Sequence, residues 1–286
     1  MKVLQNFNPS QRVYSDTISQ VESVNILNTA MRHFLTIASA IILLNSACKE
    51  STQKVEVLET FEHQSQDFMI WWVYYNDSIN LSSDFLALDS LGNEMSKSDF
   101  LEVLTTSRFL PMKLPGELKY QLYKPQKKLQ EDVFNTIMWQ SKDYLHHYRM
   151  EGLTLTDSPI KTLEGQEHQL SDPKGKYLIV KCWFVACHQC IEEMPELNEM
   201  VKKYESRGDM TFLSLAFDDE DKLRNFLSKR EFIYETASVP EGFLESELRV
   251  TAYPTHMVIG KDGKVLKVVN GADQLKNFLA KEILDS

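Results

Sequence analysis

The most constraining feature of this sequence is the pattern after Leu153, where short apolar runs of β type alternate with amphipathic helical segments. Residues 177–184 and 210–217 are nearly continuous apolar runs, which is typical of strands that are buried on both faces. A helical pattern follows each of them. This alternation predicts an α/β layer architecture that is built on a largely parallel sheet.

The rest of this C-terminal region follows the same pattern. Lys261-Asp262-Gly263-Lys264 is a strong hairpin signal and predicts that the strands on its two sides pair with each other. We therefore expect residues 151–286 to form one domain. The remaining elements are helices at 192–204, 220–229 and 273–284 and strands at 255–259 and 265–269.

The sequence of residues 55–150 predicts a smaller mixed α+β region, whose role is unknown. Aromatic residues spaced three and four apart favour an amphipathic helix over 61–75, although residues 69–75 could also form a buried strand. Leu91-Gly92-Asn93 is a turn signal. Further helices are expected at 98–106 and 131–150, and the three prolines Pro111, Pro115 and Pro125 predict a loop-rich stretch between them.

Charge and cysteine usage limit the classes of function. The net charge is -10 and the lysines and arginines form no extended cluster, so a nucleic-acid partner is not expected. The four cysteines are unevenly spread, with one at Cys48 and three between Cys182 and Cys190. This spacing does not suit a secreted disulfide scaffold. It indicates local chemistry at the second group.

Residues 31–47 have the composition of an export signal. A short basic start is followed by an apolar run at 34–44 and by small residues before Cys48. The run is too short to cross a bilayer core of roughly 30 Å, which argues against a permanent transmembrane helix. A buried helix of the folded domain is the alternative, but nothing amphipathic marks it. Because residues 1–30 lack a positive start, we interpret them as a non-native upstream extension and Met31 as the true first residue.

Two cysteines separated by two residues, Cys187 and Cys190, stand where a buried strand gives way to a helix. At a helix start this spacing lets both sulfurs come within bonding distance of each other. Free N–H groups and the helix dipole favour the thiolate of Cys187, which we therefore expect to be the attacking thiol. Cys190, one turn further on, would resolve the mixed disulfide.

The stretch Trp183-Phe184-Val185-Ala186-Cys187-His188-Gln189-Cys190-Ile191-Glu192-Glu193-Met194-Pro195 resembles the redox helix of the thioredoxin superfamily, and most closely that of its TlpA/ResA-type branch. The resemblance covers residues 151–286 and implies a thioredoxin-like fold, with a central mixed sheet flanked by helices. It also implies a membrane-tethered, extracytoplasmic thiol-disulfide oxidoreductase. Residues 165–175, with the run Leu170-Ser171-Asp172, are similar to the family's lead-in hairpin.

The resemblance assigns roles to further residues. Pro195 matches the proline that kinks the redox helix, and Tyr253-Pro254-Thr255 matches the cis-proline loop that binds substrate. A plain trans-proline turn is the alternative for Pro254. Glu193 matches a glutamate that the branch keeps near its cysteine pair. It would relay protons to Cys190 if burial raised its pKa toward neutrality, or it could be a solvated glutamate of the first helical turn.

Four residues are expected to tune the redox pair: Lys181, Trp183, His188 and Gln189. Lys181 departs from the family pattern, which places an aspartate or asparagine there. Its ammonium could stabilise a thiolate or, as we favour, extend to the edge of the sheet. A cationic His188 would stabilise the thiolate, or His188 could be only an exposed polar residue. Trp183 is expected to pack under the redox helix.

Cys182, inside the expected strand, should be an inert core thiol. The lipoprotein resemblance of residues 31–48 implies that Cys48 receives a lipid and that residues 48–54 form a flexible tether. One departure from that pattern is Asn45, where a leucine is usual. The protein would thus be lipid-anchored on the periplasmic or cell-envelope side of a bacterial membrane.

The expected reaction is the reduction of disulfides in exported client proteins by dithiol exchange. It needs no cofactor beyond the Cys187–Cys190 disulfide and no metal, but it does need a thiol electron donor in the membrane. The main alternative is a copper or zinc metallochaperone that uses Cys187, His188, Cys190 and His256. A scaffold module with an idle thioredoxin fold is a third possibility.

Overall fold

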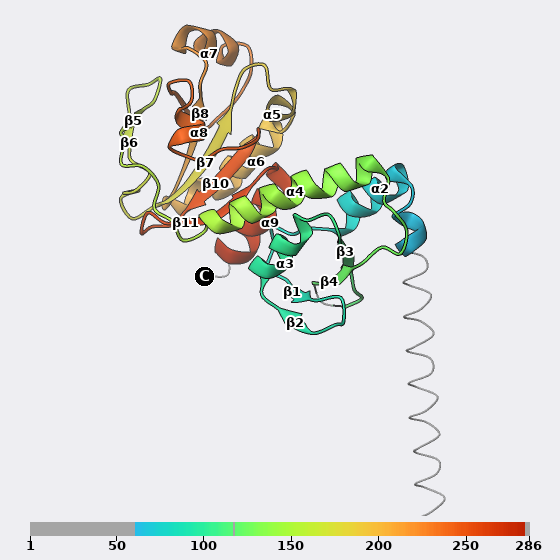
Figure 1. The fold of residues 1–286 in the computed structure, drawn as a ribbon. Coiled ribbons are helices and arrows are strands. Elements are labelled where there is room, and N and C mark those ends of the chain that lie inside the picture. The colour runs from blue at the N-terminus through green and yellow to red at the C-terminus, as the bar shows by residue number, and fades with distance from the viewer. Residues whose placement is uncertain (1–60, 117, 284–286) are drawn as a thin grey trace, which may run out of the picture. The chain divides into compact units, whose positions relative to one another are not determined.

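A five-stranded mixed sheet forms the centre of the C-terminal region in the computed structural model, which describes residues 61–116 and 118–283 (Figure 1). The strand order is β11-β10-β7-β8-β9. β7 pairs in parallel with β8 and β8 with β9, whereas β10 is antiparallel to both β7 and β11. The mixed sheet implied by the family resemblance is therefore confirmed, while the expectation of a largely parallel sheet holds only on the β8 side. The strands are β7 (Tyr177–Trp183), β8 (Met210–Ala216), β9 (Glu235–Ser238), β10 (Thr255–Ile259) and β11 (Val265–Val269).

Helices cover both faces of this sheet. Apolar side chains of α6 and α9 pack on the face that carries Ile179, Val258 and Val269. Leu244 of α8 and Met150 pack on the other face. The helices are α5 (His188–Glu192), α6 (Met194–Tyr204), α7 (Glu220–Leu227), α8 (Phe243–Ser246) and α9 (Ala272–Phe278), with short turns at Glu205–Arg207 and Leu279–Ile283.

Most expected elements of this region are present within one to a few residues of their predicted bounds. Two were missed, β9 and α8, because each is only four residues long and carries too few positions for a period to show. A lead-in hairpin is formed by β5 (Ile160–Lys161) and β6 (Glu167–His168), which pair antiparallel across a turn, so it begins earlier than the predicted range 165–175 and overlaps only its start. Leu170 of the run after it is fully buried.

The N-terminal region contains a second, four-stranded sheet in the order β2-β1-β4-β3. The aromatic-rich segment is a helix, so the strand alternative for residues 69–75 is wrong. The loop expected around Pro111 is also wrong, because Pro111 lies in β3. β3 is an edge strand, where a residue without an N–H donor is tolerated. The elements are α2 (Phe68–Ser78), β1 (Leu86–Leu88), β2 (Glu94–Met95), α3 (Lys97–Leu104), β3 (Leu110–Lys113), β4 (Lys119–Tyr123) and α4 (Glu131–Met150).

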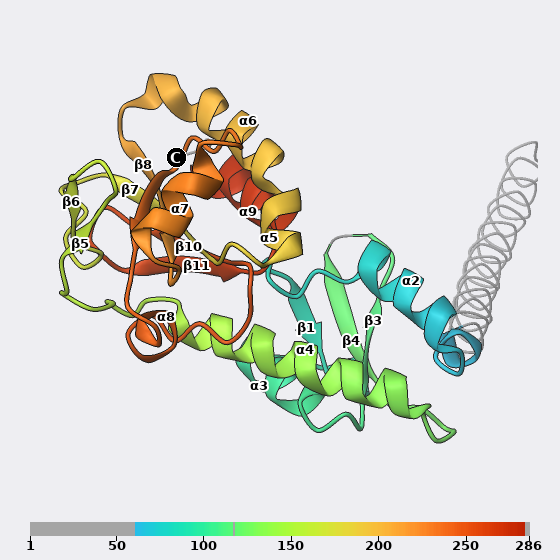
Figure 2. The same ribbon diagram turned by 90° about the horizontal axis from the view of Figure 1, so that it is seen from above.

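The long helix α4 links the two sheets and packs against β11 (Figures 1 and 2). The ammonium of Lys267 in β11 donates to the Ser82 carbonyl at 2.9 Å and to the Glu151 carboxylate at 2.7 Å. From Gln64 onward the chain clusters as one compact unit. A domain boundary near residue 150 stays a prediction.

The expected extension 1–30, the signal 31–47, Cys48 and the tether 48–54 lie outside the described residues. Among the helices that the structure describes, none is both long and apolar enough to cross a membrane.

Candidate redox site

Cys187 and Cys190 form a disulfide at the start of α5, with their Cα atoms 5.3 Å apart. Cys187 is the N-cap residue of α5, and its sulfur accepts a hydrogen bond from the Cys190 N–H at 3.2 Å. Cys187 is 7% exposed, whereas Cys190 is fully buried. A reagent approaching from solvent therefore reaches the sulfur of Cys187 first.

The loop that carries Cys187 out of β7 is held by Asp218. The Val185 N–H donates to Asp218 Oδ2 at 2.6 Å, and the Cys187 N–H donates to the Phe184 carbonyl at 3.0 Å. Lys222 pairs with the other carboxylate oxygen of Asp218. Our sequence reasoning missed Asp218. Its signal was an aspartate just after a buried strand that runs parallel to β7, where the two carboxyl ends meet at one sheet edge.

Aromatic rings surround the disulfide. Trp183 is fully buried in the cluster that also contains Cys187 and Cys190, so it packs beside the redox helix as expected. Phe184 contacts Phe217 and Tyr253, with ring centroids 5.2 and 5.4 Å away. Tyr253 also packs against the cysteine cluster. These aromatic rings give the Cys187–Cys190 disulfide an apolar environment.

The Tyr253-Pro254 peptide bond is cis, as the sequence indicated. The Pro254 carbonyl accepts a hydrogen bond from the Asn270 side-chain amide at 3.3 Å, and the Thr255 hydroxyl donates to the Ala252 carbonyl at 2.6 Å. Thr255 begins β10 directly opposite Cys182 of β7. The strand pairing thus fixes the start of the proline loop against the strand that leads to the redox pair.

The redox helix bends at Glu193, which ends α5 and precedes α6. Pro195 lies in the first turn of α6, where its missing N–H removes no helical bond that the turn needs. Inside a continuous helix its ring would clash with the carbonyl four residues earlier, so the helix is interrupted just before Pro195. The kink that the resemblance implied for Pro195 is therefore present.

Because the helix bends at Glu193, the Glu193 carboxylate lies in a buried network with Lys181 and His256. Lys181 pairs with Glu193 Oε1, and His256 Nε2 lies 3.0 Å from the same oxygen. The other oxygen, Oε2, accepts from the Ala272 N–H at 3.3 Å. Lys181 and His256 are directly opposite each other in the antiparallel β7–β10 pair. Both are fully buried. The expectation that Lys181 extends to the sheet edge is therefore wrong.

The pKa values of all three groups are lowered. Burial raises the pKa of Glu193, but the hydrogen bond and charge of His256 and the Lys181 ammonium outweigh it. Burial lowers the pKa of Lys181 and of His256, and Glu193 offsets this only in part. The condition for a proton relay through Glu193, a pKa raised toward neutrality, is not met. Glu193 is also not a solvated first-turn residue.

The amino-acid sequence was compared with known protein families and proteins. Residues 152–268 match the AhpC/TSA family. The thiol-disulfide oxidoreductase ResA of Bacillus thuringiensis subsp. konkukian is 32% identical over 126 residues, which cover 43% of this chain and 72% of ResA. The chain belongs to the ResA-type thiol-disulfide oxidoreductases.

Other proteins are also similar to this ResA-type chain. The thioredoxin-like protein YneN of Bacillus subtilis is 26% identical over 137 residues, or 47% of this chain and 80% of YneN. The solved structure of a putative thiol:disulfide interchange protein DsbE from Chlorobium tepidum is 25% identical, covers 47% of this chain and 96% of its own, and has a TM-score of 0.42. All three similarities leave at least half of the chain unmatched.

The surroundings of three further residues near this ResA-type site, His188, Gln189 and Cys182, differ in exposure. His188 is 86% exposed and lies 3.3 Å from Glu192 in an ion pair, which makes it a surface residue at the helix start. Gln189 is exposed. Cys182 is a buried free thiol, and burial raises its pKa to about 12, so it is the inert core residue that we expected.

Metal-site geometry is not found in the part of the chain that the structure describes. No group of three or more His, Cys, Asp and Glu side chains there could hold an ion. His256 turns its Nε2 to Glu193, and His188 pairs with Glu192. The metallochaperone alternative therefore has no support.

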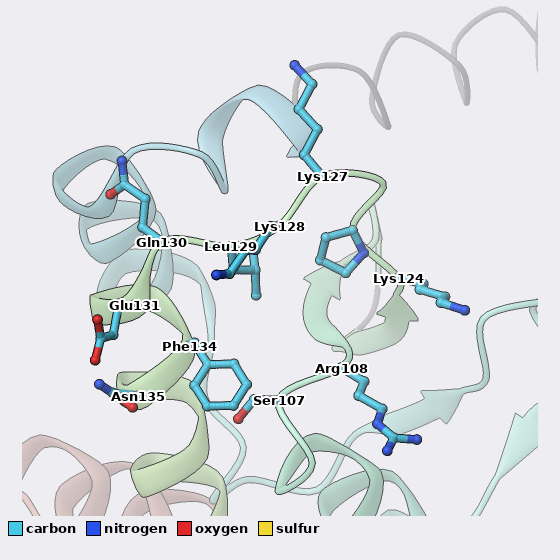
Figure 3. Close-up of a pocket in the computed structure, with 11 residues that line it drawn as sticks. Ser107, Arg108, Lys124, Lys127, Lys128, Leu129, Gln130, Glu131, Phe134 and Asn135 are labelled. Carbon is cyan, nitrogen blue, oxygen red and sulfur yellow. The ribbon is translucent and has the colours of Figure 1, made fainter.

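A cavity of about 730 Å³ lies in the N-terminal region and contains none of the expected site residues (Figure 3). Arg108, Lys124 and Lys128 line it together with Phe134. No reactive side chain of the redox chemistry faces it, so we do not connect it with exchange.

Proposed function

We propose that this protein reduces disulfide bonds of exported client proteins on the outer side of a bacterial membrane, with Cys187 as nucleophile and Cys190 as resolving thiol. The observation that carries the proposal is the disulfide at the start of α5, in which Cys187 is the more exposed partner. The relatives named thiol-disulfide oxidoreductase support it. The direction, reduction, follows from the family resemblance.

The exchange proceeds in two balanced steps. The Cys187 thiolate attacks one sulfur of the client disulfide, which forms a mixed disulfide and releases one client thiolate. The Cys190 thiol loses its proton and attacks the Cys187 sulfur. The Cys187–Cys190 disulfide forms and the second client thiolate leaves, so two electrons pass to the client. A membrane dithiol must then reduce the protein again.

The buried network of Glu193, Lys181 and His256 supports the part of the exchange that takes place on this protein's own cysteine pair. Ionised Glu193 holds Lys181 and His256 beneath the bend of the redox helix. The positive charge of Lys181 would favour a thiolate in the nearby redox pair. We assign Glu193 as a positioning residue and Lys181 as a tuning residue, with Tyr253, Pro254 and Thr255 forming the client-binding edge next to the disulfide. Trp183, His188 and Gln189 complete the surroundings that set the potential.

Location and anchoring are part of the proposal. The export-type segment 31–47 and Cys48 support a lipid anchor, and residues 48–54 would be the tether. Metabolic labelling with a fatty acid should label the full chain but not a Cys48→Ala variant. Label that persists in Cys48→Ala would contradict the anchor without touching the redox chemistry.

Trapping of mixed disulfides tests the exchange. Cys190→Ser leaves the attacking thiol in place but cannot resolve, so mixed disulfides with clients should accumulate and be released by reductant. Cys187→Ser is the matched control and should trap none. Equal activity of Cys187→Ser and the parent in insulin reduction would overturn the assignment.

The equilibrium reduction potential of the Cys187/Cys190 pair tests the direction. A client reductase should be strongly reducing, near the roughly -270 mV of thioredoxin, rather than near the roughly -120 mV of a disulfide-forming oxidant. A value at the oxidising end would reverse the proposed direction while leaving the exchange chemistry intact.

A further inference from the structure

A polar cavity of about 610 Å³ lies next to the redox helix, and both halves of the molecule line it. Gln189, the residue before Cys190, forms part of its wall, as do Asn270 and Asp273 at the start of α9. The end of α2 and α4 also line it, with Asp77 and Tyr144 among these residues. The cavity thus joins the redox motif to the N-terminal region.

The walls of this cavity, here called the redox cleft, are held by hydrogen bonds between the two halves. The Thr251 hydroxyl donates to Asp143 Oδ1 at 2.8 Å, and the Tyr144 hydroxyl bonds to the Gln274 side chain. His146 Nε2 lies 2.7 Å from the Arg249 carbonyl. These contacts attach α4 to the segment just before the cis-proline loop and to α9.

One residue of the cleft lining also contacts the cis-proline loop. Asn270, on its wall, donates to the Pro254 carbonyl at 3.3 Å. A client segment that lies along this loop would therefore continue into the cleft. Seven amide side chains line the cleft, and such groups bond to peptide N–H and carbonyl groups alike. They are Asn76, Asn80, Gln140, Gln189, Asn270, Gln274 and Asn277.

The charges that line the redox cleft indicate which kind of client segment it would bind. Three carboxylates, Asp77, Asp143 and Asp273, face the redox cleft with a single ammonium, Lys113. Opposite potentials on the two partners steer encounter and set the register of a complex. A segment with lysine or arginine beside its disulfide is favoured over an acidic one.

We propose that the redox cleft binds an extended, positively charged segment of the client polypeptide next to the client disulfide, and that the N-terminal region supplies the second wall of this site. This inference rests on the proposed function and names its substrate class. Residues 64–150 act in client selection, whereas the chemistry stays with Cys187 and Cys190.

The test compares two cyclic peptides that share one intramolecular disulfide, one flanked by lysines and the other by glutamates. The reduced full chain should exchange with the lysine peptide about fivefold faster, since exposed charge pairs contribute only modestly. The Asp77→Lys/Asp273→Lys double variant should prefer the glutamate peptide instead. Both aspartates are exposed, so the reversal does not disturb a core.

Matched controls separate the cleft from total charge. Glu94→Lys/Glu164→Lys makes the same change in net charge at exposed residues outside the lining, one in each half of the molecule, and should keep the lysine preference. Bis(2-hydroxyethyl) disulfide is neutral and too small to fill the cleft, so the Glu94→Lys/Glu164→Lys variant should reduce it at the parental rate.

The possible outcomes test the client cleft and the proposed exchange function separately. Equal rates for the two peptides, or a preference that the double reversal leaves unchanged, would overturn the client cleft while the exchange activity stands. A parent protein that exchanges with neither peptide nor the small disulfide would overturn the proposed function and this inference with it.

Discussion

Lys181 lies in the central strand of the five-stranded sheet, with its ammonium enclosed by protein and paired with Glu193. A charge in such a place is stable only with its partner, because burial removes its hydration. The register of β7 and β10 adds His256 to the same carboxylate. One glutamate therefore holds two basic side chains below the bend of the redox helix.

Substituting Lys181→Met should cost about 3 kcal/mol of unfolding free energy, since it leaves the Glu193 carboxylate buried with one partner fewer. The double variant Lys181→Met/Glu193→Gln should recover part of that loss, because neither charge remains. Urea unfolding of the oxidised protein measures both. A Lys181→Met variant as stable as the parent would show that the pair is not buried in solution.

The lowered pKa values of Glu193 and His256 predict a pH dependence of stability. Both groups hold protons more weakly in the folded than in the unfolded protein, so protonation favours unfolding. Their contribution is complete above their ordinary values of 6.5 and 4.5 and is lost as pH falls through the folded values. The urea midpoint should fall from pH 7 to pH 4.

The variant Glu193→Gln separates the two groups in this titration. It should flatten the part of the profile below pH 4.5, while the part that belongs to His256 should persist, because burial is the main cause of the lowered His256 pKa. A parental midpoint that stays constant from pH 7 to pH 4 would contradict the assignment.

At the scale of elements, the loop between β7 and α5 decides where the attacking sulfur lies. Asp218, at the end of the neighbouring strand β8, accepts the Val185 N–H and so fixes this loop. The parallel pairing of β7 with β8 brings the two strand ends together. The position of Cys187 thus depends on a residue 31 places further along the chain.

Replacing Asp218 by alanine should lower the unfolding free energy by about 2 kcal/mol, because the Val185 N–H loses its partner. Exchange with a small disulfide should also slow, since the loop before Cys187 is no longer held. Asp218→Asn keeps an acceptor oxygen and should restore most of both quantities. If the alanine and asparagine variants behave alike, the hydrogen bond does not position the loop.

At the scale of the whole molecule, α4 joins the two sheets into one compact unit from Gln64 onward. We expect residues of both regions to unfold in one transition. All four tryptophans lie in described segments, and only Trp183 is in the C-terminal region. In a variant with Trp183 alone, and likewise in Trp183→Phe, the fluorescence midpoint in urea should equal the midpoint that circular dichroism gives for the same variant. Separate midpoints would show that the regions unfold independently.

Local patterns account for much of the agreement between sequence and structure. The helix at 131–150 was predicted to its exact bounds because twenty residues repeat the helical period without a breaker. Pro111 was misread because the sequence does not show which strand is an edge. β9 and α8 were too short to produce a period. The position of the Lys181 side chain was mispredicted because the residues that it meets, Glu193 and His256, lie 12 and 75 residues away in the sequence.

The amino-acid sequence alone determined the redox pair, the bend at Pro195 and the strand–helix alternation, because each depends on residues a few positions apart. The tertiary structure decided what Lys181, Asp218 and His256 do, and it formed the redox cleft. Those features require strand register and helix packing to bring distant side chains together, and burial then sets their pairing and their pKa values.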